Sequence, residues 1–344
     1  MSETAGLVCG HHHLYSALVR GMPAPPHTPR NFGQILEQVW WRVDTALDLE
    51  MLEWSAKLGA LEALEAGCTA IVDHHESPNA IEGSLSVIAD ACAEVGVRVV
   101  CAYGVTDRHG PAGAKAGLEE NRRFLADGGR GMVGIHAGFT CEQDTIEAAI
   151  ALSEEFEVGV HVHVAEGLAD AGPGTELARR STDDWLLVHG VNLPDRLEMA
   201  GTIAHNPRSN MNNNVGYAHP TRFETDRSNS TVVLGTDGIG ADMLEEFRLA
   251  FVKLREHDVT AGPDVPWAWL ENGWKLVPEA KDDTVTWTYP TMEPWHLAYT
   301  TTVRPLEVTV DGETVLKDGK ATKVDGAEVR AKAAEQATRL FKRL

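Results

Sequence analysis

The sequence predicts an α/β protein, built as a (β/α)8 TIM-like barrel with a reduced small β lobe from its C-terminal segment. Apolar, β-branched runs alternate with helical patterns at intervals of about 25 to 35 residues, which is the spacing of βα units. There are eight such runs, and eight strands with crossover helices favour a closed barrel over an open sheet. The length of 344 residues is enough for one large barrel.

The predicted strands are the short apolar runs at 5–9, 68–72, 97–102, 131–136, 158–164, 185–188, 201–204 and 231–234. Between them, apolar residues recur at helical spacing over 48–66, 80–95, 114–126, 143–156 and 242–257. These ranges form a predicted barrel domain at 1–262.

The sequence changes character after Pro263, where tryptophan and proline become frequent. A hairpin is expected from strands at 306–310 and 314–316, because Asp311-Gly312 between them is a typical tight-turn pair. A basic helix is expected over 326–344. Residues 263–344 are therefore predicted to form the small β lobe and a closing helix.

Composition limits the partners. The chain carries 51 acidic and 30 basic residues, a formal charge of −21, so it should repel nucleic acid phosphates and anionic membranes. A small neutral or cationic substrate fits this charge better. The five cysteines form no CxxC pair and indicate reduced thiols, and no run of eighteen apolar residues predicts a membrane span. We therefore expect a cytoplasmic protein.

Four polar motifs end predicted strands: residues 10–13 (GHHH), 161–166 (HVHVAE), 188–190 (VHG) and 235–238 (GTDG). In a barrel the carboxyl ends of the strands share one mouth, so these motifs should converge. Each is weak alone, since histidines also occur in strands without binding metal and a TDG sequence is often only a turn. Their joint occurrence on four strands predicts a metal site.

The predicted ligands are His11, His13, His163 and Asp237. Residues two apart in a strand face the same side, so His11 and His13 can reach one ion while His12 points away. Three imidazoles and one carboxylate favour Zn²⁺, with Fe²⁺ as the alternative. One ion per chain is expected, because the fourth strand ends at residues 136–138 without the lysine that commonly bridges two metals in barrel hydrolases.

With these residues assembled, the chain resembles the amidohydrolase superfamily, in its deaminase and chlorohydrolase branch, and is most similar to the SsnA-type aminohydrolases. The similarity covers roughly residues 6 to 260. It is carried by the segments 6–21 (GLVCGHHHLYSALVRG), 40–44 (WWRVD), 61–76 (LEALEAGCTAIVDHHE), 205–216 (HNPRSNMNNNVG) and 234–246 (LGTDGIGADMLEE).

The resemblance implies roles for individual residues. His11, His13, His163 and Asp237 would ligate the metal, Glu166 would be the general acid and base, and His189 would stabilise the attacking water. Asp237 would also accept a proton. Expected substrate-binding residues lie at the ends of other strands: Asp73, His74, His75, His136, His205, Asn206, Arg208, Ser209 and Asn210.

The activity that follows from these roles is hydrolysis of a cyclic amidine in a purine- or pterin-like heterocycle, with release of ammonia. Ring-amide cleavage or displacement of chloride by the same water stays open. So does a shortened paralogue that binds metal or ligand without catalysis, because family members carry a longer segment before the first barrel strand. The resemblance also makes a homodimer an expectation.

Overall fold

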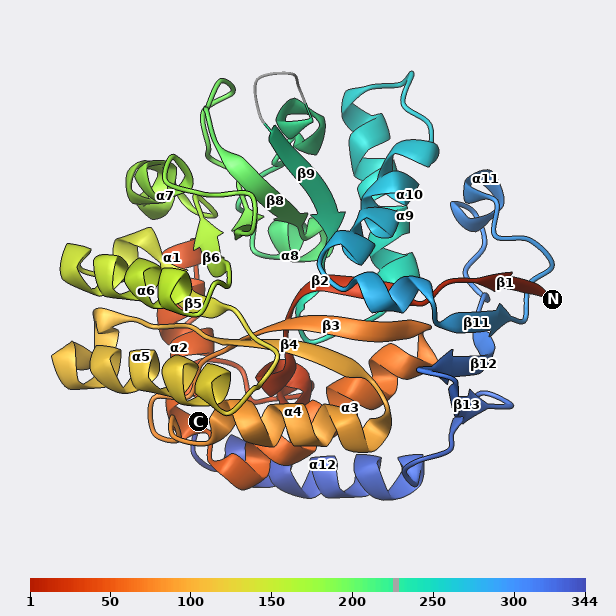
Figure 1. Ribbon diagram of the computed structural model, residues 1–344, viewed down its shortest axis with the longest axis horizontal. Helices are drawn as coiled ribbons and strands as arrows, with labels where there is room; N and C mark the ends of the chain where they lie inside the picture. Colours follow the sequence, from red (N-terminus) through yellow and green to blue (C-terminus); the bar gives the residue numbers. More distant parts are fainter. Residues whose placement is uncertain (225–228) are drawn as a thin grey trace.

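The computed structural model describes residues 1–224 and 229–344, and parallel strands surrounded by helices occupy its centre (Figure 1). The strands of this central barrel are β2 (Leu7–His13), β3 (Cys68–His75), β4 (Arg98–Tyr103), β5 (Val133–Ala137), β6 (Val160–Val164), β7 (Leu186–His189), β8 (Ala200–His205), β9 (Asn229–Leu234) and the short β10 (Asp237–Gly238). Each predicted strand coincides with one of them, with boundaries shifted by a few residues.

The strands form two parallel sheets, in the orders β10-β2-β3-β4 and β5-β6-β7-β8-β9. Isolated bridges from Cys101 to Gly131 and from Val105 to Ile135 link β4 to β5. At the other junction, β10 follows β9 along the chain and pairs with β2. The strands therefore follow one another around a barrel, and the predicted fold class is confirmed, although the hydrogen-bonded ladder is interrupted between the two sheets.

Strand β2 departs from regular alternation at Gly10 and His11. Its register with β3 shifts there, because Cys9 pairs with Ile71 and His12 with Asp73. Three steps along β2 thus match two along β3, which is a β-bulge. The extra residue places His11 inside the barrel on the same side as Val8, so strict alternation alone would have misplaced one of them.

Helices cover the outside of the barrel (Figure 1). Several begin at an aspartate whose carboxylate accepts backbone N–H groups of the first turn, as at Asp48 for α3 and Asp242 for α9. The helices around the barrel are α1 (Phe32–Ile35), α2 (Trp41–Ala46), α3 (Leu49–Glu65), α4 (Ser84–Val95), α5 (Gly110–Ala126), α6 (Gln143–Glu155), α7 (Ala171–Ala178), α8 (Pro207–Asn212), α9 (Met243–His257) and α10 (Asp264–Glu271). A π-helical turn, η2 (Leu36–Trp40), joins α1 to α2.

The amino end of the barrel is filled with apolar side chains. Val8, Val72, Val100 and Leu186 are buried there together with Val277, which follows the short helix η7 (Asn272–Lys275). This segment closes the amino end of the barrel.

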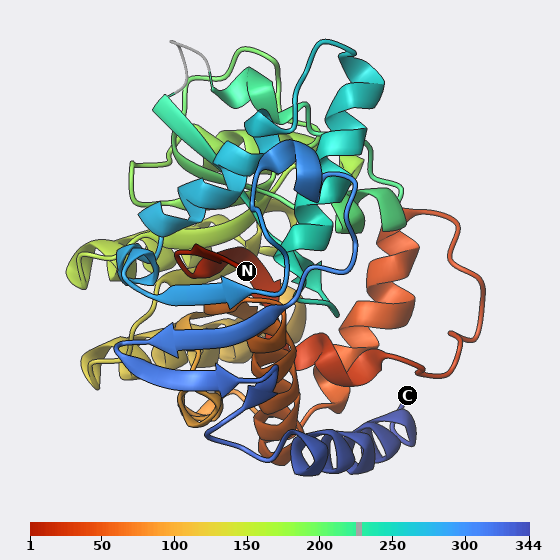
Figure 2. The same ribbon diagram turned by 90° about the vertical axis from the view of Figure 1, so that its right-hand side faces the viewer.

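A five-stranded antiparallel sheet stands beside the barrel (Figure 2). Its strands are β1 (Ser2–Thr4), β11 (Thr284–Trp287), β12 (Pro305–Val310), β13 (Glu313–Lys317) and β14 (Lys320–Ala321), in that order. Asp311 and Gly312 join β12 to β13 and both have positive φ, as a two-residue type I′ turn requires. The predicted hairpin is present, and the sheet also takes in β1 from the N-terminus.

The last helices are α11 (Pro294–Leu297) and α12 (Gly326–Phe341). Arg339 and Arg343 near the C-terminus pair with Asp48 at 3.0 and 2.7 Å, so α12 lies along α3 on the barrel surface. The division into domains at residue 262 stays a prediction. Within the described residues, no helix is both long and apolar enough to cross a membrane.

Candidate metal centre and active site

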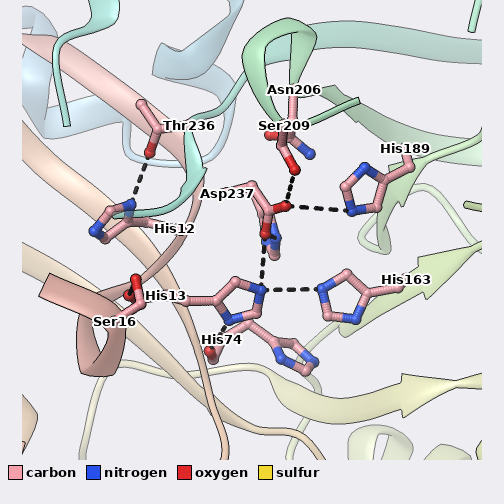
Figure 3. A network of polar contacts seen from close by, with 12 residues as sticks. His12, His13, Ser16, His74, His163, His189, Asn206, Ser209, Thr236 and Asp237 are labelled. Atoms are coloured by element: carbon pink, nitrogen blue, oxygen red, sulfur yellow. Dashed lines mark hydrogen bonds and ion pairs between the residues drawn. The ribbon is translucent and has the colours of Figure 1, made fainter. Parts of the chain in front are cut away.

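The four predicted metal ligands meet at the carboxyl end of the barrel. Figure 3 shows His13, His163 and Asp237 of this group. His11 and His13 come from β2, His163 from β6 and Asp237 from β10, and one potential ligand atom of each lies within 4.8 Å of the others. Asp237 Oδ1 is 3.0 Å from His13 Nε2 and 3.4 Å from His11 Nε2. His13 Nε2 is 3.3 Å from His163 Nε2. Donors this close together fit one divalent ion.

The opposite ring nitrogen of each ligand is held by the protein. His13 Nδ1 donates to the His74 carbonyl at 2.5 Å, and His163 Nδ1 donates to the His136 carbonyl at 2.6 Å. His11 Nδ1 lies 2.8 Å from His161 Nε2. Such contacts fix the tautomer that leaves Nε2 free for a metal.

Burial favours the neutral, ligating form of these imidazoles. His11 Nε2 is buried and makes no hydrogen bond of good geometry. Burial lowers the pKa of His11 well below its usual value, and burial with the charge of His13 lowers the pKa of His163 to about 3. For His13, burial is outweighed by the Asp237 carboxylate, which raises the pKa. The donor set therefore suits a cation.

A second group of side chains, Glu166, His189 and Asp237, shares the carboxylate with the first. His189 Nε2 is 3.5 Å from Glu166 Oε2 and 4.0 Å from Asp237 Oδ2. Burial, together with the charge of Asp237, raises the pKa of Glu166 well above its usual value. Burial would also raise the pKa of Asp237, but its close contacts with His11 and His13 hold that pKa well below its usual range. The pKa values of the two carboxyl groups are thus shifted in opposite directions.

The backbone around these groups is strained. Ala165, His189 and Asp237 have φ of 49°, 71° and 58°, in the left-handed region that non-glycine residues seldom adopt. Strained residues persist where the surrounding structure fixes them, and they cluster at functional sites.

A pocket with a cavity volume of about 550 Å³ opens onto the cluster, and His13, His163, Glu166 and Asp237 are among its lining residues. This volume lies in the range of small-molecule sites. The segment from α1 to α2 supplies an aromatic wall with Phe32, Trp40 and Trp41. Other large apolar side chains in the lining include Leu36, Phe139 and Leu168.

His136 is the predicted substrate-binding residue that lines this pocket. Asp73, His74 and His75 lie behind it, buried at the end of β3. Asp73 Oδ1 accepts the Leu14 amide at 2.7 Å, while His75 Nε2 lies 2.7 Å from Ser77 Oγ. Their contacts hold the strand ends together.

The predicted residues at the end of β8 and in α8 also lie behind the pocket lining. His205 and Asn206 are fully buried. Ser209 donates to Asp237 Oδ2, and Asn210 Oδ1 lies 2.8 Å from His189 Nδ1. Arg208 binds Glu246 and backbone carbonyls next to Asp237. Ser209 and Asn210 thus contact Asp237 and His189, and Arg208 contacts the backbone on either side of Asp237.

His12 and His161 do not line the pocket. His12 Nδ1 lies 2.7 Å from Thr236 Oγ1, on the side of β2 away from the cluster, as the alternation predicted (Figure 3). His161 is buried one step deeper than the ligands, beneath His11.

Sequence reasoning missed a charged cluster in the pocket wall, made of Asp44, Glu76 and Arg108. Arg108 Nη2 is 3.2 Å from Asp44 Oδ2 and contacts Glu76 Oε1, and its guanidinium lies 4.5 Å from the Trp41 ring. Burial raises the pKa of both carboxyls, the charge of Glu76 adds to the rise for Asp44, and Arg108 opposes the rise in both. Asp44 and Glu76 end two segments that carry the family resemblance, but nothing in the sequence pairs them with Arg108.

Comparison with known proteins identifies the family. Residues 4–267 match the model of the Amidohydrolase family. The chain belongs to this family. Two curated relatives are similar over nearly the whole chain. A protein of Methanopyrus kandleri named 5'-deoxyadenosine deaminase is 28% identical, over 97% of this chain and 86% of that protein. A protein of Symbiobacterium thermophilum named 5-methylthioadenosine/S-adenosylhomocysteine deaminase is 27% identical, over 98% and 86%.

The crystal structure of an adenosine deaminase from Xanthomonas campestris with bound zinc shares the fold of this amidohydrolase. The TM-score is 0.80 at 19% identity, and the match covers 99% of this chain and 86% of that one. The predicted superfamily and its deaminase branch are confirmed by these comparisons, while the narrower SsnA-type assignment stays a prediction.

Proposed function

We propose that this amidohydrolase is a zinc-dependent aminohydrolase that releases ammonia from a purine-like heterocycle, with adenosine-type nucleosides as the first candidates. The observation that carries the proposal is the meeting of His11, His13, His163 and Asp237 with Glu166 at the base of one pocket. The deaminase names of the curated relatives support the substrate class.

The donor set supports zinc. Three imidazoles and one carboxylate are typical zinc ligands, and ferrous iron accepts the same set. A divalent ion held here would lower the pKa of an attacking water and polarise it. Metal analysis of protein purified without added metal distinguishes the two ions, and we expect one zinc per chain.

The protein side chains would move two protons. Glu166 takes the first proton from the water as its oxygen bonds to the carbon that carries the amino group, and Glu166 passes this proton to the neighbouring ring nitrogen. Asp237 Oδ2 takes the second proton and gives it to the amino group. The C–N bond then breaks and ammonia leaves. His189 Nε2 faces both carboxylates and stabilises the charge that develops between them.

An assay of ammonia release tests the proposal. We would incubate the zinc-loaded protein with adenosine, 5'-deoxyadenosine, 5'-methylthioadenosine, a pterin and a chlorinated triazine. Ammonia from the purine nucleosides supports the proposal. Chloride release or ring opening without ammonia would favour the other hydrolytic reactions, and bound zinc with no turnover of any compound would favour a non-catalytic paralogue.

Two finer expectations accompany the function. The homodimer is testable by light scattering, and the cytoplasmic location by fractionation of the source cells. Both stay predictions.

A further inference from the structure

Helix α8 (Pro207–Asn212) packs against the two strand ends that carry Asp237 and His189. Its side chains were expected to contact substrate. In the structure, three consecutive residues of this helix, Arg208, Ser209 and Asn210, instead reach the two proposed catalytic groups or the backbone that carries them.

Arg208 holds the backbone on both sides of Asp237. Its Nη2 lies 3.1 Å from the Thr236 carbonyl, 3.3 Å from that of Gly238 and 3.3 Å from that of Gly240. Its Nε donates to Glu246 Oε1 at 2.8 Å, and Glu246 is fully buried in α9. One guanidinium, itself fixed by a buried carboxylate, thus binds three carbonyls of the turn.

The turn at residues 236–240 has a strained backbone that the Arg208 contacts can stabilise. Asp237 and Ile239 have φ of 58° and 79°, in the left-handed region that non-glycine residues seldom adopt. The strain persists only where other contacts fix the backbone. The Arg208 contacts to residues 236, 238 and 240 do this.

Ser209 binds one of the two carboxylate oxygens of Asp237 and leaves the other facing the histidine ligands. Its hydroxyl donates to Oδ2, while Oδ1 faces His13 Nε2 (Figure 3). Oδ1 also lies 3.4 Å from His11 Nε2. Asn213 Nδ2 donates to Ser209 Oγ at 3.2 Å and so fixes the hydroxyl in turn. Rotation of the carboxylate away from the metal ligands would break the Ser209 hydrogen bond.

Asn210 fixes the orientation of the His189 ring. The Nδ1–H of His189 donates to Asn210 Oδ1 at 2.8 Å, which aims Nε2 at Glu166 and Asp237.

We propose that α8 is a positioning element, in which Arg208 and Ser209 fix the backbone and carboxylate of Asp237 and Asn210 orients His189, rather than a substrate-binding surface. The proposal rests on the proposed function for the roles of Asp237 and His189. It predicts that changes at Arg208, Ser209 or Asn210 alter metal binding or the chemical step, and that they do so equally for every substrate.

Ser209→Ala tests this, with Met211→Ala as the control, because Met211 lies on the same helix and is 39% exposed. We would measure the zinc dissociation constant by chelator competition, the visible absorption of the cobalt-substituted protein, and kcat and KM for two substrates that differ in their sugar. For Ser209→Ala we expect zinc affinity or kcat to fall about 10- to 100-fold, with KM unchanged and the same factor for both substrates. Met211→Ala should match the wild type.

Two further variants keep the test decisive. Ser209→Thr retains the hydroxyl and should restore most of the loss, and it replaces the alanine variant if that variant does not fold. Arg208→Lys keeps a positive charge, but its single nitrogen cannot bind Glu246 and the three carbonyls at once, so its cobalt spectrum should shift.

A raised KM with unchanged kcat, zinc affinity and cobalt spectrum would overturn the proposal and restore the substrate-binding interpretation. Unchanged values of every quantity in both Ser209→Ala and Arg208→Lys would overturn it as well. The zinc and cobalt measurements need no substrate. They therefore decide the proposal even if no heterocycle is turned over and the proposed function fails.

Discussion

The two ends of the barrel are built from the same strands, but apolar side chains fill the amino end and polar side chains fill the carboxyl end. At the amino end, β2, β3 and β7 place Val8, Val72 and Leu186 inside, where they pack on Val277. At the carboxyl end, β2 places His11 inside instead. An apolar side chain needs only volume to be buried, whereas each buried ring nitrogen needs a partner of its own.

The backbone also differs between the two ends. Strand β2 shifts its register with β3 at both ends, between Leu7 and Val8 and again between Cys9 and His12. Positive φ at the non-glycine residues Ala165, His189 and Asp237, in contrast, occurs around the cluster. The difference teaches that the site depends on strained backbone positions, which persist where surrounding contacts fix them.

The largest effect should follow loss of the Glu166 carboxyl group, which lies in the active-site pocket. Glu166→Gln removes the group that we assign to the first proton transfer, so kcat should fall about 10²- to 10⁴-fold. Zinc content should stay at the wild-type level because Glu166 is not assigned as a ligand. Steady-state kinetics with metal analysis checks this, and full turnover in the variant would remove Glu166 from the mechanism.

Truncation of a side chain at the amino end of the barrel should lower stability and leave zinc binding unchanged. Leu186→Ala leaves a cavity among fully buried apolar residues and should lower the free energy of unfolding by about 2 to 5 kcal/mol. The zinc dissociation constant should not change. Denaturant unfolding with chelator competition measures both, and weakened zinc binding without loss of stability would mean that the two ends are not separable.

His161 lies between the two ends, so a substitution there tests whether it belongs to the metal site or to the apolar filling. His161→Leu keeps the volume but removes the nitrogen 2.8 Å from His11 Nδ1, so zinc affinity should fall about 10- to 100-fold. Unfolding of the metal-free protein should change little by comparison. If zinc affinity stays at the wild-type value, His161 belongs with the apolar filling rather than with the site.

The smallest effect should come from outside the barrel. Arg330 of α12 pairs with Glu65 of α3, and both side chains are partly exposed. Arg330→Ala should cost about 0 to 1 kcal/mol of stability, less at high salt. Thermal unfolding at low and high salt checks this. A loss comparable to that in Leu186→Ala would mean that α12 is more than a surface helix.

Much of this arrangement could be predicted from the sequence. Runs of β-branched residues located the strands because parallel strands buried on both faces are apolar along their length. Strand ends carrying His11, His13, His163 and Asp237 indicated the cluster, because the carboxyl ends of barrel strands share one mouth.

Other features required coordinates. The register shift at Gly10 depends on how β2 pairs with β3, and the turn that gives Asp237 its positive φ is bound by the distant residue Arg208; no local pattern encodes either. The roles of Ser209 and Asn210 were equally hidden, because a polar residue near a strand end is compatible with binding either a substrate or a neighbouring side chain.

The central claim is that His11, His13, His163 and Asp237 bind one ion together. X-ray absorption at the zinc edge of the zinc-loaded protein tests it most directly. The account predicts one zinc per chain with three imidazole nitrogens and carboxylate or water oxygens at about 2.0 to 2.2 Å. A spectrum with sulfur ligands at about 2.3 Å, or with fewer than three imidazoles, would contradict it.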